Sequence, residues 1–234
     1  CVGVEILLRW NNPRQGWISP DVFIPLAEEH NLIVPLTRYV INETVKQIGY
    51  FPKTQDFHIC INVAASHFRQ SALIHDLNRY WFSQHPAQQL IVELTERDAL
   101  LDVDCHIVRE LHRQGVKLAI DDFGTGNSAL SWLEKLRPDV LKIDKSFTSA
   151  IGTDAVNSTV TDMIIALGQQ LNIELVAEGV ETQQQARYLR HHGVSILQGY
   201  LYAQPMPLRD FPTWLAESAS PPAQRNGHVL PIMP

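Results

Sequence analysis

Strand-like and helix-like segments alternate along almost the whole chain, and this alternation constrains the fold more than any other feature of the sequence. Short runs rich in Val, Ile and Leu, typical of buried strands, lie at 2–8, 58–63, 90–95, 116–120, 140–143, 174–177 and 195–198. Helical patterns lie between them, at 19–29, 35–48, 66–82, 99–114, 128–136, 155–170 and 182–192. Such regular alternation predicts a parallel sheet whose strands are joined by helical crossovers.

Helix-end signals agree with this reading. Gly115 follows the predicted helix 99–114 and is expected to cap it, because glycine adopts the left-handed conformation that ends many helices. Thr182 and Gln185 have the spacing of a capping box, which predicts a helix that begins there.

A parallel sheet of this kind can be an open, doubly wound sheet or a closed barrel, and the polar residues decide between them. A different polar side chain lies in or at the end of each predicted strand: Glu5, Asn62, Glu93, Asp121, Lys142, Glu178 and Gln198. An open sheet would spread these positions along a wide edge, whereas a barrel gathers them on one face. We therefore predict an α/β fold, a modified TIM-like (β/α)8 barrel.

Seven strands are visible, so we expect the first helix and first strand of the barrel to be missing from this fragment. The chain opens in mid-strand without an initiator Met, which favours a piece cut from a longer protein. We expect one domain over 1–218. The segment 219–234 has four prolines and no periodicity, and we expect it to be a disordered C-terminal tail.

Two adjacent carboxylates, Asp121 and Asp122, end the predicted strand 116–120 and are followed by Gly124 and Gly126. Neighbouring side chains on a strand point to opposite faces, so a strand alone cannot aim both carboxylates into one site. A sharp glycine-containing loop can. Two carboxylates held together repel each other, and a bound cation is the usual remedy.

No Cys or His occupies a matching strand end, and six residues there offer only oxygen ligands: Glu5, Asn62, Glu93, Asp121, Asp122 and Glu178. Hard oxygen donors select Mg²⁺, Mn²⁺ or Ca²⁺ over zinc or copper. Five carboxylates and one amide exceed what a single Mg²⁺ takes from protein, so two ions about 3.5–4 Å apart are expected. Such pairs hydrolyse phosphoesters, and Lys142 would add a positive charge near the attacking water or the phosphate.

Bulk properties exclude several classes of function. The net charge is −6 and no basic run is present, which argues against binding a nucleic-acid polymer or an anionic membrane. No run of about 18 apolar residues and no signal peptide are present. Three scattered cysteines fit neither a disulfide framework nor a zinc site, and Cys60 reads as a buried structural thiol. A cytoplasmic domain is therefore expected.

Seven motifs in order resemble the EAL domain, the phosphodiesterase domain that linearises cyclic di-GMP. They lie between residues 2 and 215: Gly3-Val4-Glu5-Ile6-Leu7-Leu8-Arg9-Trp10, Ile61-Asn62-Val63-Ala64, Glu93-Leu94-Thr95-Glu96, Asp121-Asp122-Phe123-Gly124-Thr125-Gly126, Leu141-Lys142-Ile143-Asp144, Ala177-Glu178-Gly179-Val180-Glu181 and Gln198-Gly199-Tyr200.

The resemblance implies a role for each matching residue. Glu5, Asn62, Glu93 and Asp121 would hold one metal ion, and Asp121 and Asp122, with Glu178, the second. Lys142 would orient the catalytic water, with Gln198 and Glu178 beside it. Glu96 would brace the Asp121–Gly126 loop without touching metal. Arg9 would contact a substrate phosphate, and Leu7 would also lie against the substrate.

The resemblance also implies cofactors and partners. Mg²⁺ or Mn²⁺ would support catalysis and Ca²⁺ would inhibit it. Similar domains are barrels with one antiparallel strand and often form homodimers through the region after the Asp-Asp-Phe-Gly loop. A regulatory N-terminal domain, in a parent protein that is membrane-anchored in some architectures, is expected to precede the domain.

Two departures from the family pattern concern the signature and the barrel. The signature reads Glu5-Ile6-Leu7 rather than Glu-Ala-Leu, and its middle residue is not a ligand. The missing leading helix and strand would leave an open sheet edge with unpaired backbone groups.

Three functions remain open. The first is hydrolysis of cyclic di-GMP to linear 5′-pGpG. The second is a catalytically inactive module that binds cyclic di-GMP or a protein partner, and the third is hydrolysis of another phosphodiester. Inactive members typically lose a metal ligand, the lysine or the loop-bracing glutamate, and none of these is lost here. The sequence therefore favours the enzyme.

Overall fold

A parallel sheet forms the centre of the protein, with nine strands within the described residues. The computed structural model describes residues 1–68, 72–100, 103–126, 131–153, 156–218 and 229–233. The strands are β1 (Gly3–Ile6), β4 (His58–Asn62), β5 (Gln89–Thr95), β6 (Lys117–Phe123), β7 (Val140–Ile143), β8 (Glu174–Ala177), β9 (Ile196–Leu197), β10 (Met206–Pro207) and β11 (Val229–Met233). Their order is β10-β11-β1-β4-β5-β6-β7-β8-β9, and every pairing between them is parallel.

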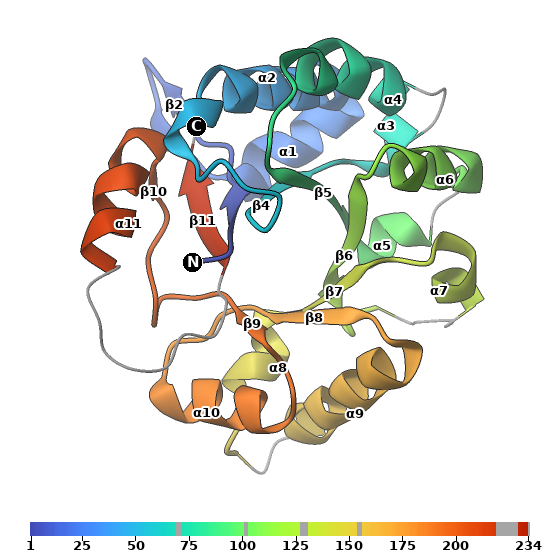
Figure 1. Ribbon diagram of the computed structural model, residues 1–234, viewed down its shortest axis with the longest axis vertical. Coiled ribbons are helices and arrows are strands. Elements are labelled where there is room, and N and C mark those ends of the chain that lie inside the picture. The colour runs from blue at the N-terminus through green and yellow to red at the C-terminus, as the bar shows by residue number, and fades with distance from the viewer. Residues whose placement is uncertain (69–71, 101–102, 127–130, 154–155, 219–228, 234) are drawn as a thin grey trace.

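The sheet curls around a central axis with its helices on the outside (Figure 1). This architecture confirms the predicted α/β, TIM-like barrel class. Among the described residues no strand pairing joins β9 to β10, so the hydrogen-bonded ring stays open at that point.

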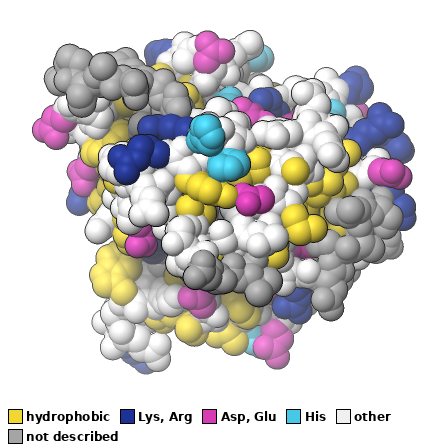
Figure 2. All heavy atoms as spheres, turned by 90° about the horizontal axis from the view of Figure 1, so that it is seen from below, with side chains coloured by type: hydrophobic (Ala, Val, Ile, Leu, Met, Phe, Trp, Pro, Cys, Tyr) yellow, Lys and Arg dark blue, Asp and Glu magenta, His cyan; other side chains and the backbone are white. Residues whose placement is uncertain are grey.

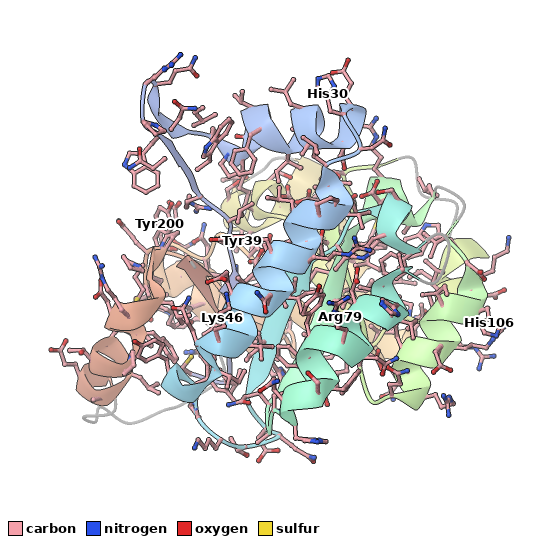
Figure 3. The ribbon with its side chains drawn as sticks, turned by 90° about the horizontal axis from the view of Figure 1, so that it is seen from above. His30, Tyr39, Lys46, Arg79, His106 and Tyr200 are labelled. Carbon is pink, nitrogen blue, oxygen red and sulfur yellow. The ribbon has the colours of Figure 1, made fainter. Side chains whose placement is uncertain are left out.

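The outer layer consists of helices that follow the strands. They are α1 (Pro20–Glu29), α2 (Ile33–Lys46), α3 (Ala65–Phe68), α4 (Ala72–Asp76), the π-helical η3 (Leu77–Trp81), α5 (Glu96–Ala99), α6 (Cys105–Arg113), α7 (Ser131–Leu136), α8 (Lys145–Ser149), α9 (Val156–Leu171), α10 (Gln183–His191) and α11 (Phe211–Ser218), with short 3₁₀ turns at Ile48–Tyr50, Phe82–Gln84 and Leu208–Asp210. Figure 3 shows part of this layer, with Tyr39 and Lys46 on α2, Arg79 on η3 and His106 on α6.

Helix ends explain where the prediction was too coarse. The segment predicted as one helix over 99–114 contains α6, which begins at Cys105 because the Asp104 side chain accepts a hydrogen bond from the backbone of His106. The segment 66–82 likewise contains α3, α4 and η3. The capping box of Thr182 and Gln185 is confirmed.

Two apolar layers hold the barrel together. The larger lies between the strands and the helices and includes Ile59, Leu118 and Leu141. The smaller fills the barrel interior and consists of Cys60, Ile91, Ala119, Val140, Val176 and Ile196. Because side chains alternate along a strand, each of the strands β4 to β9 contributes to both layers, which is why these strands are rich in apolar residues.

The C-terminal segment corrects one expectation. Val229–Met233 forms β11, which lies between β10 and β1 and pairs with β1 from Gly3↔Val229 to Ile6↔Ile232. A disordered tail over 219–234 is therefore wrong for these five residues, while 219–228 and 234 lie outside the described part of the chain. β11 covers the edge of β1 that the sequence analysis expected to be open. This pairing satisfies backbone groups of β1 that would otherwise be free to pair with another chain.

Two further details differ from the sequence analysis. The first strand ends at Ile6, and an antiparallel hairpin of β2 (Trp10–Asn12) and β3 (Gly16–Ile18) follows it. This pair is the antiparallel one among the described strands, and it lies outside the main sheet.

The described surface is mixed in charge. Figure 2 shows acidic and basic side chains interspersed on the face seen from below, without an extended basic field among the atoms described there. No helix within the described ranges is long and apolar enough to span a membrane.

Candidate metal-binding and catalytic site

Polar side chains cluster inside the barrel at the carboxyl-terminal ends of the strands. Each strand places its inward-facing residues in register with those of its neighbours, above the apolar layer of Cys60 and Ile91. This polar layer contains all seven residues that were predicted to lie in or at the end of a strand: Glu5, Asn62, Glu93, Asp121, Lys142, Glu178 and Gln198. The structure therefore brings together all the residues that the sequence placed at strand ends.

Lys142 lies at the centre of this layer and is 1% exposed. Its Nζ lies 2.7 Å from Glu178 Oε1, 3.0 Å from Glu93 Oε2, 3.2 Å from Asp121 Oδ1 and 3.6 Å from Glu5 Oε2. One ammonium group thus faces four carboxylates, which leaves the cluster with an excess of negative charge.

Glu5 is held by two side-chain amides. Asn62 Nδ2 donates to Glu5 Oε1 at 2.8 Å, and Gln198 Nε2 donates to Glu5 Oε2 at 2.7 Å. The Oε1 atom of Gln198 is buried and has no hydrogen-bond partner among the described residues. A buried acceptor without a partner is costly, so this atom fits a site that takes up water or a ligand.

A β-bulge aims Asp121 and Asp122 into the same region. β6 extends through both residues, and its register with β7 shifts between Ile120 and Phe123. Asp122 adopts a left-handed φ of 54°, and its backbone N–H donates to Asp121 Oδ1 at 3.0 Å. The sharp turn expected after the strand is therefore built into the strand itself, because bulges redirect side chains.

Glu96 braces the loop that follows. Its Oε2 accepts hydrogen bonds from the backbone N–H groups of Gly124, at 2.8 Å, and Gly126, at 3.2 Å. Gly124 has a φ of 96°, and a Cβ there would lie 2.7 Å from Ile164 Cδ1, so the position requires glycine. This is the contact that the sequence analysis expected of Glu96.

Burial and mutual repulsion raise the pKa values of three acids in the cluster. Burial, reinforced by repulsion from Glu5 and Asp121, raises the pKa of Glu93 well above its ordinary value, although Lys142 opposes the shift. Burial also raises the pKa of Glu178 to about 8, against the attraction of Lys142. Burial and the Asp121 charge raise the pKa of Asp122 to about 6. The positive charge of Lys142 therefore does not offset the burial and repulsion of these three carboxylates.

Glu5 and Lys142 differ from the other groups. Burial would raise the pKa of Glu5, but the Lys142 charge and the two amide donors together lower it. Burial would lower the pKa of Lys142, but the carboxylates, Asp121 and Glu178 foremost, raise it well above its ordinary value. Lys142 is therefore an ammonium at neutral pH.

The donor set fits divalent cations. Glu5, Glu93 and Asp121 bring one oxygen each within 4.8 Å of one another, and so do Asp121, Asp122 and Glu178. The two triads share Asp121, as a bridging ligand would require. All the donors are oxygens, which suits Mg²⁺ or Mn²⁺. The excess of negative charge and the raised pKa values agree with this fit.

A cavity of about 250 Å³ adjoins the cluster. Leu7 and Arg9 line it together with Asn62 and Glu93, so the two expected substrate contacts lie beside two expected metal ligands. Arg9 Nη1 donates to the backbone oxygen of Leu8 at 2.8 Å.

Sequence reasoning missed two acids at the rim. Asp98 lines this cavity and a second one of about 530 Å³ that also reaches Asp122. Asp144, at the end of β7, adds to the charge that raises the pKa of Asp122, although its own side chain caps α8. The signal for Asp144 was its place two residues after Lys142, where the next inward position falls.

Most of the sequence matches a known domain family. Residues 1–205 match the family model described as the EAL domain. The probable cyclic di-GMP phosphodiesterase PdeD of Escherichia coli (strain K12) is 79% identical over 234 residues, which cover 100% of this chain and 44% of that relative. The probable cyclic di-GMP phosphodiesterase PdeN of the same organism is 42% identical over 224 residues, which cover 94% of this chain and 43% of the relative.

A solved structure agrees with these matches. The phosphodiesterase PaMucR, in complex with c-di-GMP, superposes with a TM-score of 0.79 at 36% identity and covers 89% of this chain and 87% of its own. A MucR relative is found in Pseudomonas aeruginosa. The chain spans less than half the length of the curated relatives PdeD and PdeN.

Proposed function

The chain belongs to the EAL domain family, and on that premise we propose that it hydrolyses one phosphodiester bond of cyclic di-GMP to give linear 5′-pGpG. One observation carries the proposal: the two carboxylate triads share Asp121 and surround Lys142 at the carboxyl-terminal face of the barrel. The names of PdeD and PdeN and the bound ligand of PaMucR support the choice of substrate.

The metal ligands follow from the cluster. Glu5, Asn62, Glu93 and Asp121 would hold one divalent cation, and Asp121, Asp122 and Glu178 the other. When bound, two such ions lower the pKa of a water molecule and neutralise charge on the phosphate. Mg²⁺ or Mn²⁺ would serve, whereas the larger Ca²⁺, with its looser geometry, would inhibit.

The remaining residues position these groups. Lys142 offers a fixed positive charge to the attacking water and to the negative charge that develops on the phosphate. Gln198 and Asn62 fix Glu5 through their amides. Glu96 holds the Asp121–Gly126 loop. Arg9 and Leu7 contact the substrate from the adjoining cavity.

Assembly and context are part of the same proposal. We propose that the domain forms a homodimer and lies in a cytoplasmic portion of a longer parent with a regulatory N-terminal domain, a parent that is membrane-anchored in some architectures. The greater length of the curated relatives supports the longer parent. Light scattering coupled to size exclusion would measure the mass of the 26.5 kDa chain in solution and would contradict the homodimer if one chain were found.

The deciding experiment is incubation with cyclic di-GMP and Mg²⁺ or Mn²⁺, with products separated by chromatography. We expect linear 5′-pGpG, less of it in Ca²⁺, and none in a chelator. Binding of cyclic di-GMP without product would instead identify the inactive module, and turnover of another phosphodiester alone would identify a different substrate. Equal turnover in Ca²⁺ and Mg²⁺ would contradict the two-metal assignment.

A further inference from the structure

Lys142 and the expected metal ions share the same carboxylates. The ammonium group lies within 3.6 Å of Glu5, Glu93, Asp121 and Glu178, and each of these four belongs to one of the two triads. Asp121, the residue that the triads share, lies 3.2 Å from Nζ. The side chain is 1% exposed, so the ammonium group is shielded from bulk water.

This arrangement sets attraction against repulsion. The ammonium charge neutralises part of a buried acidic cluster that would otherwise be strongly destabilising. A divalent cation among the same carboxylates would lie close to that ammonium, and like charges a few ångströms apart repel strongly where water is scarce. The same contacts that stabilise the metal-free cluster therefore oppose metal binding.

We propose that Lys142 is an internal counter-ion that sets the affinity for divalent cations, holding the carboxylate cluster together before metal binds and competing with the metal for its ligands. This inference rests on the proposed metal site and concerns binding, whereas the proposed function of Lys142 concerns turnover. Removing the ammonium group should therefore tighten metal binding and destabilise the metal-free protein, although it slows catalysis.

Lys117 provides a matched control. It lies at the opposite end of β6, two residues before Ala119 of the interior layer, and its partly exposed side chain pairs through Nζ with Glu174 Oε2 at 3.5 Å. Lys117→Met removes one positive charge from the same sheet, as Lys142→Met does, but Lys117 forms no ion pair with any of the four carboxylates. The pair of variants separates local competition from a general effect of net charge.

The experiment measures Mn²⁺ and Mg²⁺ binding by isothermal titration calorimetry and thermal unfolding with chelator or with Mn²⁺. The samples are the unchanged chain, Lys142→Met, Lys142→Arg and Lys117→Met, each purified with Mn²⁺ and then stripped of metal, at a pH of about 8.5 to keep most carboxylates ionised.

We expect Lys142→Met to bind metal at least roughly tenfold more tightly than the unchanged chain does, because the variant lacks a close like charge. Its melting temperature should fall in chelator and recover more on adding Mn²⁺ than that of the unchanged chain. Lys142→Arg and Lys117→Met should bind metal about as the unchanged chain does.

Each outcome bears on the proposal. Unchanged or weaker metal binding by Lys142→Met, with normal binding by the unchanged chain, overturns it and leaves the proposed function intact. Equal tightening in Lys117→Met also overturns it, because the effect would then be one of net charge. If Lys142→Met fails to fold without metal, binding is measured by exchange from the Mn²⁺-loaded form against a fluorescent chelator. If the unchanged chain binds neither Mg²⁺ nor Mn²⁺, the metal site itself is wrong and this inference falls with it.

Discussion

The two ends of the barrel interior differ in how their charges are balanced. At the amino-terminal end, Lys117 and Glu174 form one ion pair at 3.5 Å, close to His58, whose pKa is lowered by burial and by the Lys117 charge. At the carboxyl-terminal end, one lysine faces four carboxylates. An interior cluster that balances itself can serve structure alone, whereas an unbalanced one is costly unless another cation compensates. This difference supports placing the proposed chemistry at the carboxyl-terminal end.

The largest effect is expected from Glu5, which two amides hold in the unbalanced cluster. Glu5→Gln keeps the shape of the side chain but removes its charge and one acceptor, so we expect hydrolysis of cyclic di-GMP to fall below detection while the fold persists. Product chromatography measures the first and circular dichroism the second. Near-normal turnover would remove Glu5 from the ligand set.

Lys142 lies at the same carboxyl-terminal end, and its substitution is expected to lower the rate of hydrolysis. Lys142→Ala should lower kcat by about 10²–10³, the usual cost of losing one group that stabilises charge in the transition state, with little change in KM. Lys142→Arg should restore little of it, because a planar guanidinium does not reproduce a compact ammonium. A rise in KM at constant kcat would make Lys142 a substrate-binding residue.

Glu96 should matter through the loop. Glu96→Gln keeps the size of the side chain but replaces a charged acceptor by a neutral one, which weakens the bonds to Gly124 and Gly126. Supporting residues of this kind typically change metal affinity or activity by about 10–100-fold. When activity is measured as a function of Mn²⁺ concentration, the concentration that gives half-maximal activity should rise. A crystal structure with Glu96 bound directly to metal would contradict the bracing role.

A smaller effect concerns pH and stability without metal. The pKa of Glu178 is raised to about 8 from its ordinary 4.5, so the protonated form is the one the fold favours. Its stabilising contribution is full below about 4.5 and is lost as pH rises through about 8. In chelator, the melting temperature should fall over that range, and it should fall less in Glu178→Gln. The same slope in both proteins would show that Glu178 is not responsible.

The smallest effect is expected at the balanced end. Lys117 and Glu174 are partly exposed, and exposed ion pairs contribute about 0–1 kcal/mol. Lys117→Met should therefore leave kcat, KM and product unchanged and lower the melting temperature only slightly. A loss of activity comparable to that of Lys142→Ala would remove the contrast between the two ends.

The sequence predicted the strand ends well because two simple periodicities determine them. Alternation along a strand and parallel register bring Asn62, Glu93 and Asp121 to one face without any further information. The bulge at Asp121 and Asp122 was beyond such reasoning, since it depends on the pairing of β6 with β7. The position of Lys142 between four carboxylates also depends on side-chain packing across several strands, which no single segment encodes.

Backbone pairing explains the remaining miss. Val229–Met233 is short, contains Pro231 and shows no period, so it resembled a tail. Its place in the sheet comes from β1, whose free edge lies some 220 residues earlier in the chain. Long-range pairing of this kind cannot be predicted from local composition.

The pairing of β11 with β1 also fixes the order in which the protein can be completed during synthesis. Gly3 leaves the ribosome long before Val229, its partner, and Glu5 before Gln198, which donates to it. Contacts of such sequence separation slow folding, and an exposed strand edge invites pairing with a neighbouring chain in the meantime. During synthesis of this domain, β1 thus waits for its site partner until Gln198 has been translated, and for its covering strand until Val229–Met233 has been translated.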